Sequence, residues 1–346
     1  MTNPLAADLH HILDHTHSLW DELRGERLFI TGGTGFFGCW LLESFLWANQ
    51  RLNLHSRATV LTRHPQAFLA KIPHLAQNPA VQLLQGDVRS FSFPPGTFSH
   101  VIHAATEASA KLNVENPLLM LDTIIEGTRH ALDFSVAAGA KKFLLTSSGA
   151  VYGEQPADLT HVPEDYFGAP DSLDPNSAYG QGKRLAEHLC TLYAQNTPLE
   201  MKIARCFAFV GPYLPLDIHF AIGNFLRDGL NGGPIIVQGD GTPQRSYLYA
   251  PDLAIWLWTI LFNGKHLRPY NVGSDQSLSI AETAARVAQA FQTDIRVEIR
   301  GQANPQKAVE RYVPDIQRAR SELGLAPKIA LDMALQASIH FLEENQ

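Results

Sequence analysis

Cysteine is scarce in this sequence, and neither a basic excess nor a long apolar run is present. Its three cysteines, Cys39, Cys190 and Cys206, are widely separated and have neither metal-site spacing nor the pattern of a disulfide framework. They fit a reducing compartment, so we expect a cytoplasmic protein. Lys and Arg number 27 against 34 Asp and Glu, and no basic run occurs, which argues against a nucleic-acid partner. Small molecules are the expected partners.

The first residues of the chain lack the features of targeting segments. They carry acidic side chains and several histidines in place of the basic start and apolar run of a signal peptide. No stretch of the chain approaches the roughly 18 apolar residues that suggest a membrane span, so we expect no membrane partner. Helical spacing of apolar residues predicts a helical N-terminal extension over residues 1–25, packed on the body through Leu5, Leu9, Ile12, Leu13, Trp20 and Leu23. The histidines here are irregularly spaced, and we predict no metal site.

From residue 27 onward, short apolar runs alternate with helical patterns. The runs lie at residues 28–30, 58–61, 81–84, 100–103 and 143–145. Such alternation predicts the α/β class, with a Rossmann-type doubly wound parallel sheet covered by helices on both faces. Beyond it the chain is less regular, with Pro and Gly clusters and two helical stretches. We predict an NAD(P)-binding Rossmann domain over residues 26–205, joined by later strands, and a smaller, mainly substrate-binding lobe over residues 206–346.

A glycine-rich turn directly follows the first predicted strand. Gly32, Gly35 and Gly38 have the spacing GxxGxxG, and an apolar helical run follows them. Between a strand and a helix N-terminus, backbone N–H groups and the helix dipole meet a pyrophosphate, and the last glycine lets the helix pack closely on the sheet. The motif predicts dinucleotide binding, with Phe36 and Phe37 at the same site.

The end of the second predicted strand bears on the choice of cofactor. An acidic residue there bonds the ribose 2′-hydroxyl, whereas a basic residue accommodates a 2′-phosphate. Arg63 stands at this place, and its guanidinium is suited to a bidentate phosphate contact. The sequence therefore favours NADP, with NAD as the alternative if Arg63 is an ordinary surface arginine.

Tyr179 and Lys183 are four residues apart, which places them on one face of a helix, one turn from each other. A tyrosine with its usual pKa of about 10 is a poor base at neutral pH, so a neighbouring ammonium is needed to lower that pKa. The pair also occurs by chance in ordinary helices. Here it follows a predicted strand that ends in serines, at the spacing expected for a serine that shares a substrate hydroxyl with the tyrosine.

Taken together, these motifs resemble the extended short-chain dehydrogenase/reductase family, in its NAD-dependent epimerase/dehydratase group. The resemblance covers roughly Glu26 to Pro327 and includes residues 103–105, 147–153, 205–212, 239–252 and 270–273. It implies that Tyr179 exchanges the proton of a C4 hydroxyl while hydride moves to or from the nicotinamide. It further implies that Lys183 holds the nicotinamide ribose and tunes Tyr179, and that Ser148, in preference to Ser147, aligns the substrate hydroxyl.

The resemblance also implies contacts with both ligands. For the cofactor it adds Asp87 and Val88 near the adenine, and Ala104 and Ala105 at the end of the fourth strand. For the substrate it implies that Arg245 and Arg311 grip the diphosphate of a sugar nucleotide, a structural ion pair being the alternative for each. Asn224 is a further candidate, because Ala208 stands where the family commonly has an asparagine. A homodimer formed through the helix after Ile124 and the helix of Tyr179 is also implied.

Two positions depart from the 4,6-dehydratases of this family, which carry acidic residues directly after the catalytic hydroxyl residue. Gly149 and Ala150 stand there in this chain. Elimination of water across C5 and C6 needs an acid and a base that these residues lack. The lack of an acidic residue also argues against a UDP-glucuronate decarboxylase, since those relatives carry a Glu at the same place. Glu107 or another carboxylate replaces the missing acidic residue only if the fold places it in the active site.

We therefore expect an NAD(P)-dependent sugar-nucleotide C4 epimerase or 4-ketoreductase. An epimerase retains its cofactor through the cycle, whereas a ketoreductase consumes NADPH, so cofactor release separates the two. A 4,6-dehydratase is the enzymatic alternative. A reductase of steroid-like or flavonoid-like ketones would have no use for Arg245 and Arg311, and relatives that became non-catalytic NADP-binding regulators usually lose the Tyr179/Lys183 pair.

Overall fold

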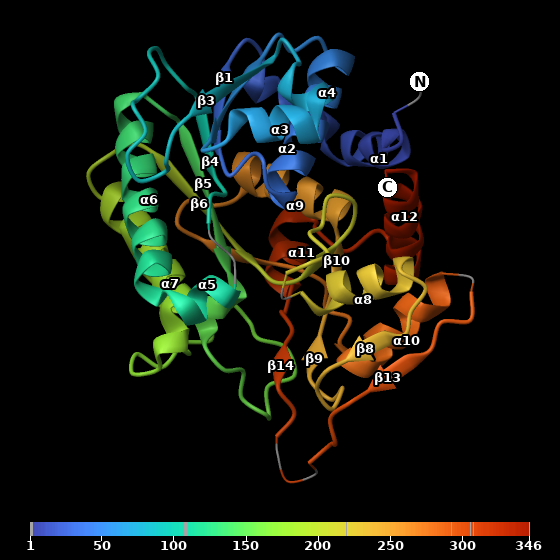
Figure 1. Ribbon diagram of the computed structural model, residues 1–346. Helices are drawn as coiled ribbons and strands as arrows, with labels where there is room; N and C mark the ends of the chain where they lie inside the picture. Colours follow the sequence, from blue (N-terminus) through green and yellow to red (C-terminus); the bar gives the residue numbers. More distant parts are fainter. Residues whose placement is uncertain are drawn as a thin grey trace.

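A parallel sheet forms the centre of the computed structural model, which describes residues 3–106, 110–218, 220–291, 293–304, 306 and 308–345. Its seven strands lie in the order β11-β6-β5-β4-β1-β2-β3 (Figure 1). Their bounds are β1 Arg27–Thr31, β2 Arg57–Thr62, β3 Val81–Gln85, β4 His100–His103, β5 Lys142–Ser148, β6 Glu200–Cys206 and β11 Pro269–Val272. All neighbours pair in parallel. The predicted Rossmann-type α/β sheet is confirmed, and each of the five predicted apolar runs lies within a strand.

Helices cover both faces of the sheet. On one face, α6 (Pro117–Ala137) and α7 (Ala178–Ala194) pack on Phe29, Phe143 and Met201. On the other face lie α2 (Phe36–Arg51) and α9 (Ala250–Asn263), with the short α3 (Pro65–Lys71) and α4 (Pro73–Ala76) beside them. Helix α9 is buried over almost its whole length, and this explains why it is apolar on every side.

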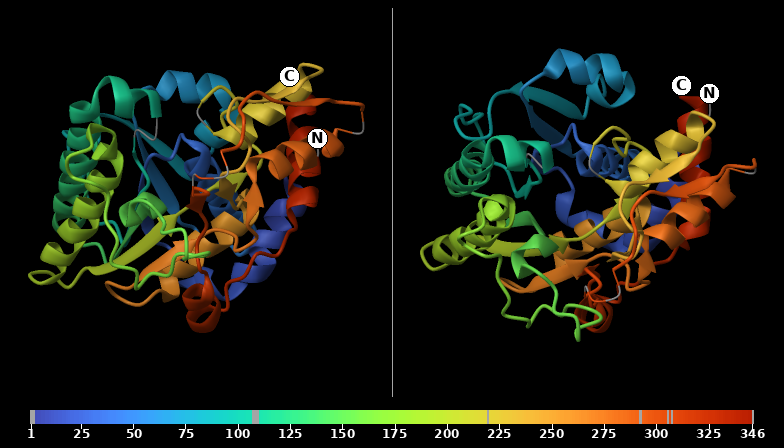
Figure 2. Two further views of the ribbon diagram at one scale, coloured as in Figure 1. Left: turned by 90° about the horizontal axis from the view of Figure 1, so that it is seen from below. Right: turned by 60° about the horizontal axis from the view of Figure 1, so that its bottom comes forward.

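The N-terminal residues form α1 (Ala6–Thr16) and the 3₁₀ helix η1 (His17–Leu23). Leu9 and Ile12 of α1 are buried, and the Trp20 ring lies 4.7 Å from the Trp258 ring of α9. These contacts pack α1 and η1 against the body of the molecule. The N-terminus lies on the same side of the molecule as the C-terminal helix α12 (Leu331–Glu344) (Figure 1, Figure 2).

The lobe beside the sheet is built from α8 (Ala221–Leu230), α10 (Ile280–Ala290), α12 and several very short strands around one apolar cluster. The strand pairs are β8 (Ile235–Val237) with β13 (Val297–Ile299), and β7 (Phe209–Val210) with β10 (Leu248–Tyr249). A three-stranded sheet has β9 (Gln244–Arg245) between β12 (Leu278–Ser279) and β14 (Arg311–Tyr312). Its register places Tyr312 opposite Arg245. The short helices are α5 (Ala110–Glu115), α11 (Gln317–Leu323), η2 (Gly149–Tyr152) and η3 (Pro175–Ser177).

The described residues contain neither a candidate membrane span nor a candidate metal site. None of the helices there is long and apolar enough to cross a bilayer. No group of three or more His, Cys, Asp or Glu side chains in that part of the chain is arranged to hold a metal ion. The three cysteines are buried and carry free thiols.

Candidate active site

The glycine-rich turn joins β1 to α2 at the carboxyl edge of the sheet. Gly32 has a φ of +72°, and a Cβ atom there would lie 2.5 Å from the backbone of Ala104 and Ala105. A Cβ atom on Gly38 would lie 2.3 Å from Gly33 Cα. Gly35 precedes Phe36, the first residue of α2. The structure therefore brings the turn and the end of β4 together, and close backbone packing requires glycine at Gly32 and Gly38.

Polar contacts fix the end of β4 beside this turn. The Thr31 hydroxyl lies 2.8 Å from His103 Nδ1 and accepts a hydrogen bond of 3.1 Å from the backbone N–H of Ala105. Burial lowers the pKa of His103 to about 3, so the imidazole is neutral. The buried hydroxyl of Thr106 has no hydrogen-bond partner within the described residues. Glycines that leave no room for a side chain, a helix N-terminus and an unsatisfied hydroxyl fit a bound dinucleotide.

Asp87 and Arg89 form an ion pair near Arg63, which follows the end of β2. Asp87 accepts hydrogen bonds of 2.9 and 3.1 Å from the Arg89 guanidinium. These bonds, together with the charge of exposed Arg63, hold the pKa of Asp87 below its usual range. Val88 lies against α6, where a Cβ atom on Gly127 would be 2.8 Å from Val88 Cγ1. Two arginines, and not Arg63 alone, thus flank Asp87. Arg89 was not predicted from the sequence, although it lies only two residues from Asp87.

Helix α7 presents Tyr179 and Lys183 to the end of β5. The Lys183 ammonium lies 5.8 Å from the centre of the Tyr179 ring and donates a hydrogen bond of 2.9 Å to the Thr146 carbonyl oxygen. Burial lowers the pKa of Lys183 to about 8. Burial raises the pKa of Tyr179, and nearby Tyr312 adds to the rise, while a hydrogen bond with Ser148 opposes it. The protein alone therefore keeps Tyr179 protonated at neutral pH.

The two serines at the end of β5 have different hydrogen-bond partners. Ser147 donates a hydrogen bond of 2.6 Å to Glu187 of α7. Ser148 accepts one of 3.1 Å from the backbone N–H of Ala150, and its Oγ lies 3.3 Å from the Tyr312 hydroxyl. Ser148 thus lies between two tyrosines, Tyr179 and Tyr312.

Sequence reasoning missed Tyr312 and Phe207, which occupy the space beside Gly149. A Cβ atom on Gly149 would lie 2.7 Å from the Phe207 ring and 2.8 Å from the Tyr312 hydroxyl oxygen. The two rings contact each other with centroids 4.7 Å apart. No spacing rule links Tyr312 to a serine 164 positions away in the chain. The possible substitute carboxylate Glu107 lies outside the described residues.

The predicted substrate-binding residues of the lobe, Arg245, Arg311 and Asn224, each have a hydrogen-bond partner within the protein. Arg245 forms an ion pair of 2.5 Å with Glu310, and its guanidinium carbon lies 6.0 Å from the centre of the Tyr312 ring. Arg311, next to Tyr312 on β14, donates a hydrogen bond of 2.9 Å to the Ala157 carbonyl oxygen. Arg311 thus belongs to β14, the strand whose Tyr312 reaches Ser148. Pairing of β9 with β14 places Arg245 beside the same strand. Asn224 accepts a bond of 3.2 Å from Arg227 within its own helix, α8.

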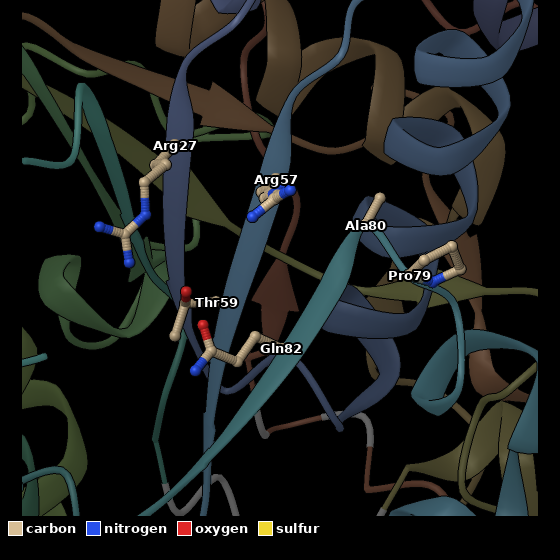
Figure 3. Close-up of a pocket in the computed structure, with 6 residues that line it drawn as sticks. All are labelled: Arg27, Arg57, Thr59, Pro79, Ala80 and Gln82. Carbon is tan, nitrogen blue, oxygen red and sulfur yellow. The ribbon is translucent and has the colours of Figure 1, made fainter.

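A separate hollow of about 410 Å³ lies at the opposite end of the sheet (Figure 3). Arg27 and Arg57, the first residues of β1 and β2, line it together with Thr59, Pro79, Ala80 and Gln82. The glycine turn and Ser148 lie at the other ends of the strands, so this hollow is no part of the site.

The seven-stranded parallel sheet, with Ser148, Tyr179 and Lys183 gathered at the end of β5, is typical of enzymes of the short-chain dehydrogenase/reductase class. The chain belongs to the NAD dependent epimerase/dehydratase family, whose model matches residues 28–273. It is thus an enzyme of a family that modifies sugar nucleotides.

Individual relatives differ in the reaction they are named for. UDP-glucuronic acid decarboxylase 6 of Arabidopsis thaliana is 30% identical over 88% of this chain and 85% of its own length. A UDP-glucuronic acid 4-epimerase from Bacillus cereus, solved with UDP-glucuronic acid and NAD, superposes with a TM-score of 0.77 at 21% identity, covering 92% of this chain and 100% of that one. A dTDP-glucose 4,6-dehydratase from Streptomyces venezuelae, solved with NAD, gives 0.76 at 22% identity, covering 92% and 97%. These structural likenesses support the fold.

Proposed function

We propose that this protein catalyses hydride and proton transfer at C4 of a sugar nucleotide, as a C4 epimerase or a 4-ketoreductase. The observation that carries the proposal is the Ser148-Tyr179-Lys183 arrangement, next to which Gly149 and Ala150 supply no carboxylate. The glycine turn and the end of β4 hold the dinucleotide. A sugar nucleotide is the substrate class, because the named relatives act on or bind UDP- and dTDP-sugars.

In the proposed reaction, Tyr179 exchanges a proton with the C4 oxygen and Ser148 donates a hydrogen bond to the same oxygen. A bound nicotinamide supplies or accepts the hydride at C4. The Lys183 ammonium stabilises the tyrosinate that forms when a ketone is reduced, and a positively charged neighbour is required because burial alone raises the pKa of Tyr179. As in the family it resembles, Lys183 would also hold the nicotinamide ribose of a bound dinucleotide.

For the cofactor we propose NADP, held at its 2′-phosphate by Arg63 and Arg89. Both guanidiniums act on Asp87, so a phosphate placed there meets two cations and one carboxylate. NAD is the alternative, and it is the nucleotide in the two structural neighbours.

For the substrate diphosphate we propose Arg245 and Arg311 as the binding residues, with Asn224 as a further contact. Arg245 would exchange its ion pair with Glu310 for the diphosphate. Residues 206–346 are then mainly the substrate lobe, residues 26–205 mainly the dinucleotide domain, and residues 1–25 a helical extension. The buried free thiols are compatible with a cytoplasmic location.

A homodimer is also proposed, because α6 and α7 carry exposed apolar side chains. Leu118 and Val136 lie about five turns apart on α6, and Leu185 and Leu192 about two turns apart on α7. All four are exposed, Leu118 by 72%. Burying these side chains against a second copy would remove apolar surface from water.

A decarboxylase is the second candidate, because relatives that are 30% identical carry that name. To separate the reactions, the purified protein is incubated with UDP-glucuronic acid, with UDP-hexoses and with a 4-keto-6-deoxy sugar nucleotide, each with NAD or NADPH. The proposal predicts inversion or reduction at C4 and a loss of at least a hundredfold in kcat for Tyr179→Phe. Release of carbon dioxide, or formation of a 4-keto-6-deoxy product, would contradict it.

A further inference from the structure

The Ser148 hydroxyl has few hydrogen-bonding positions left for a substrate. A hydroxyl group has one hydrogen to donate and two lone pairs that accept. One lone pair of Ser148 Oγ accepts the backbone N–H of Ala150 at 3.1 Å. The second lone pair and the hydrogen therefore have to serve both Tyr312, whose hydroxyl lies 3.3 Å away, and an oxygen on the Tyr179 side.

The Tyr312 hydroxyl has a choice of acceptors. Its oxygen lies 3.3 Å from Ser148 Oγ and 3.4 Å from the carbonyl oxygen of Cys206. While it donates to Cys206, it can accept the hydrogen of Ser148. While it donates to Ser148, the hydrogen of Ser148 is directed elsewhere. Packing against Phe207, with ring centroids 4.7 Å apart, holds the Tyr312 ring in place for either arrangement.

A ketone or alkoxide oxygen at C4 removes this choice, because such an oxygen carries no hydrogen and can only accept. Ser148 must then donate to it, and the second lone pair of Ser148 is left for the Tyr312 hydroxyl. We propose that Tyr312 is a positioning residue that donates to Ser148 and so turns the Ser148 hydrogen toward the C4 oxygen. The inference rests on the proposed function for the chemistry of the substrate, and on the described residues for the geometry.

Gly149 is what allows Tyr312 to come this close. A Cβ atom at this position would lie 2.8 Å from the Tyr312 hydroxyl oxygen and 2.7 Å from the Phe207 ring. Contacts this short force a neighbour to move. The glycine that removes a carboxylate from the site thus also makes room for the Tyr312 hydroxyl beside Ser148.

A double-mutant cycle tests the inference. Tyr312→Phe should lower kcat about fivefold, the effect of one neutral hydrogen bond, and leave KM within about twofold. In a Ser148→Ala background the same substitution should have no further effect, since the residue through which Tyr312 acts is absent. Tyr166→Phe, in another half-buried tyrosine of the same cluster, is the matched control and should leave kcat unchanged. A fivefold loss in both backgrounds, or a change in KM alone, would overturn the inference.

A crystal structure of Tyr312→Phe tests the same relation without turnover. The inference expects Ser148 Oγ in a second rotamer, or a water molecule in the place of the lost hydroxyl. Ser148 in a single unchanged rotamer, with no water beside it, would overturn it. If the wild-type protein acts on no sugar nucleotide, the proposed function fails, and the crystal structure still decides whether Tyr312 holds Ser148.

Discussion

The ammonium of Lys183 lies 5.8 Å from the centre of the Tyr179 ring, one helical turn away and buried beside the end of β5. Burial that lowers the pKa of Lys183 also raises that of Tyr179, so the charged forms of the two residues are costly unless they occur together. The pair is therefore suited to a reaction in which a tyrosinate appears only transiently, next to an ammonium.

The pH dependence of ketone reduction follows from this pair. In the free enzyme the pKa of Lys183 is about 8, so raising the pH through that value removes the ammonium that stabilises the tyrosinate. We expect kcat/KM to fall above pH about 8 in steady-state assays, while Tyr179 stays protonated. Lys183→Arg should be slower but should lose this alkaline fall, because a guanidinium stays charged. An identical alkaline limb in Lys183→Arg would assign the titration to another group.

Cofactor preference depends on Arg63 and Arg89. Arg63→Ala should weaken NADPH binding by about tenfold, the effect of one lost charge-assisted contact, and leave NADH binding unchanged. Fluorescence titration of the nucleotide-free protein measures both affinities. Arg57→Ala is the matched control, because Arg57 begins the strand that Arg63 follows and lines the hollow at the other end of the sheet. Stoichiometric NAD in the purified protein would refute the NADP proposal and favour a cofactor-retaining epimerase.

The glycine turn gives a paired prediction for stability. A Cβ atom on Gly38 would meet Gly33 Cα at 2.3 Å, whereas one on Gly35 would lie 3.5 Å from the nearest atom, the Gly32 carbonyl oxygen. Gly38→Ala should lower the free energy of unfolding by about 1–3 kcal/mol, because α2 has to move away from the turn. Gly35→Ala should cost less. Denaturant unfolding without nucleotide compares the two, and equal losses would show that close packing does not explain Gly38.

A charge introduced on α7 tests the proposed dimer contact. Leu185→Glu on α7 should convert the dimer to monomer in sedimentation experiments, since a carboxylate in an apolar interface remains unpaired. Met333→Glu on α12, another exposed apolar position, is the control and should leave the dimer intact. If the wild-type protein is a monomer at micromolar concentration, the dimer proposal is wrong.

The sequence allowed prediction of features that depend on neighbours along the chain. Buried parallel strands are apolar throughout, so residues 28–30 and 143–145 were identifiable, and one helical turn fixes Tyr179 relative to Lys183. Contacts between distant segments were not predictable. Tyr312 reaches Ser148 only because the two-residue strand β14 pairs with β9, and strands this short show no periodicity. That the Thr106 hydroxyl finds no hydrogen-bond partner among the described residues is likewise visible only in the fold.

Deuterium labelling shows whether hydride is delivered to C4 of the sugar. The protein is incubated with a 4-keto sugar nucleotide and NADPH deuterated at the transferring position, and the product is analysed by mass spectrometry and NMR. For a 4-ketoreductase we expect one deuterium at C4, with negligible transfer in Tyr179→Phe. Deuterium at another carbon, or turnover by loss of carbon dioxide or water without deuterium at C4, would contradict this expectation.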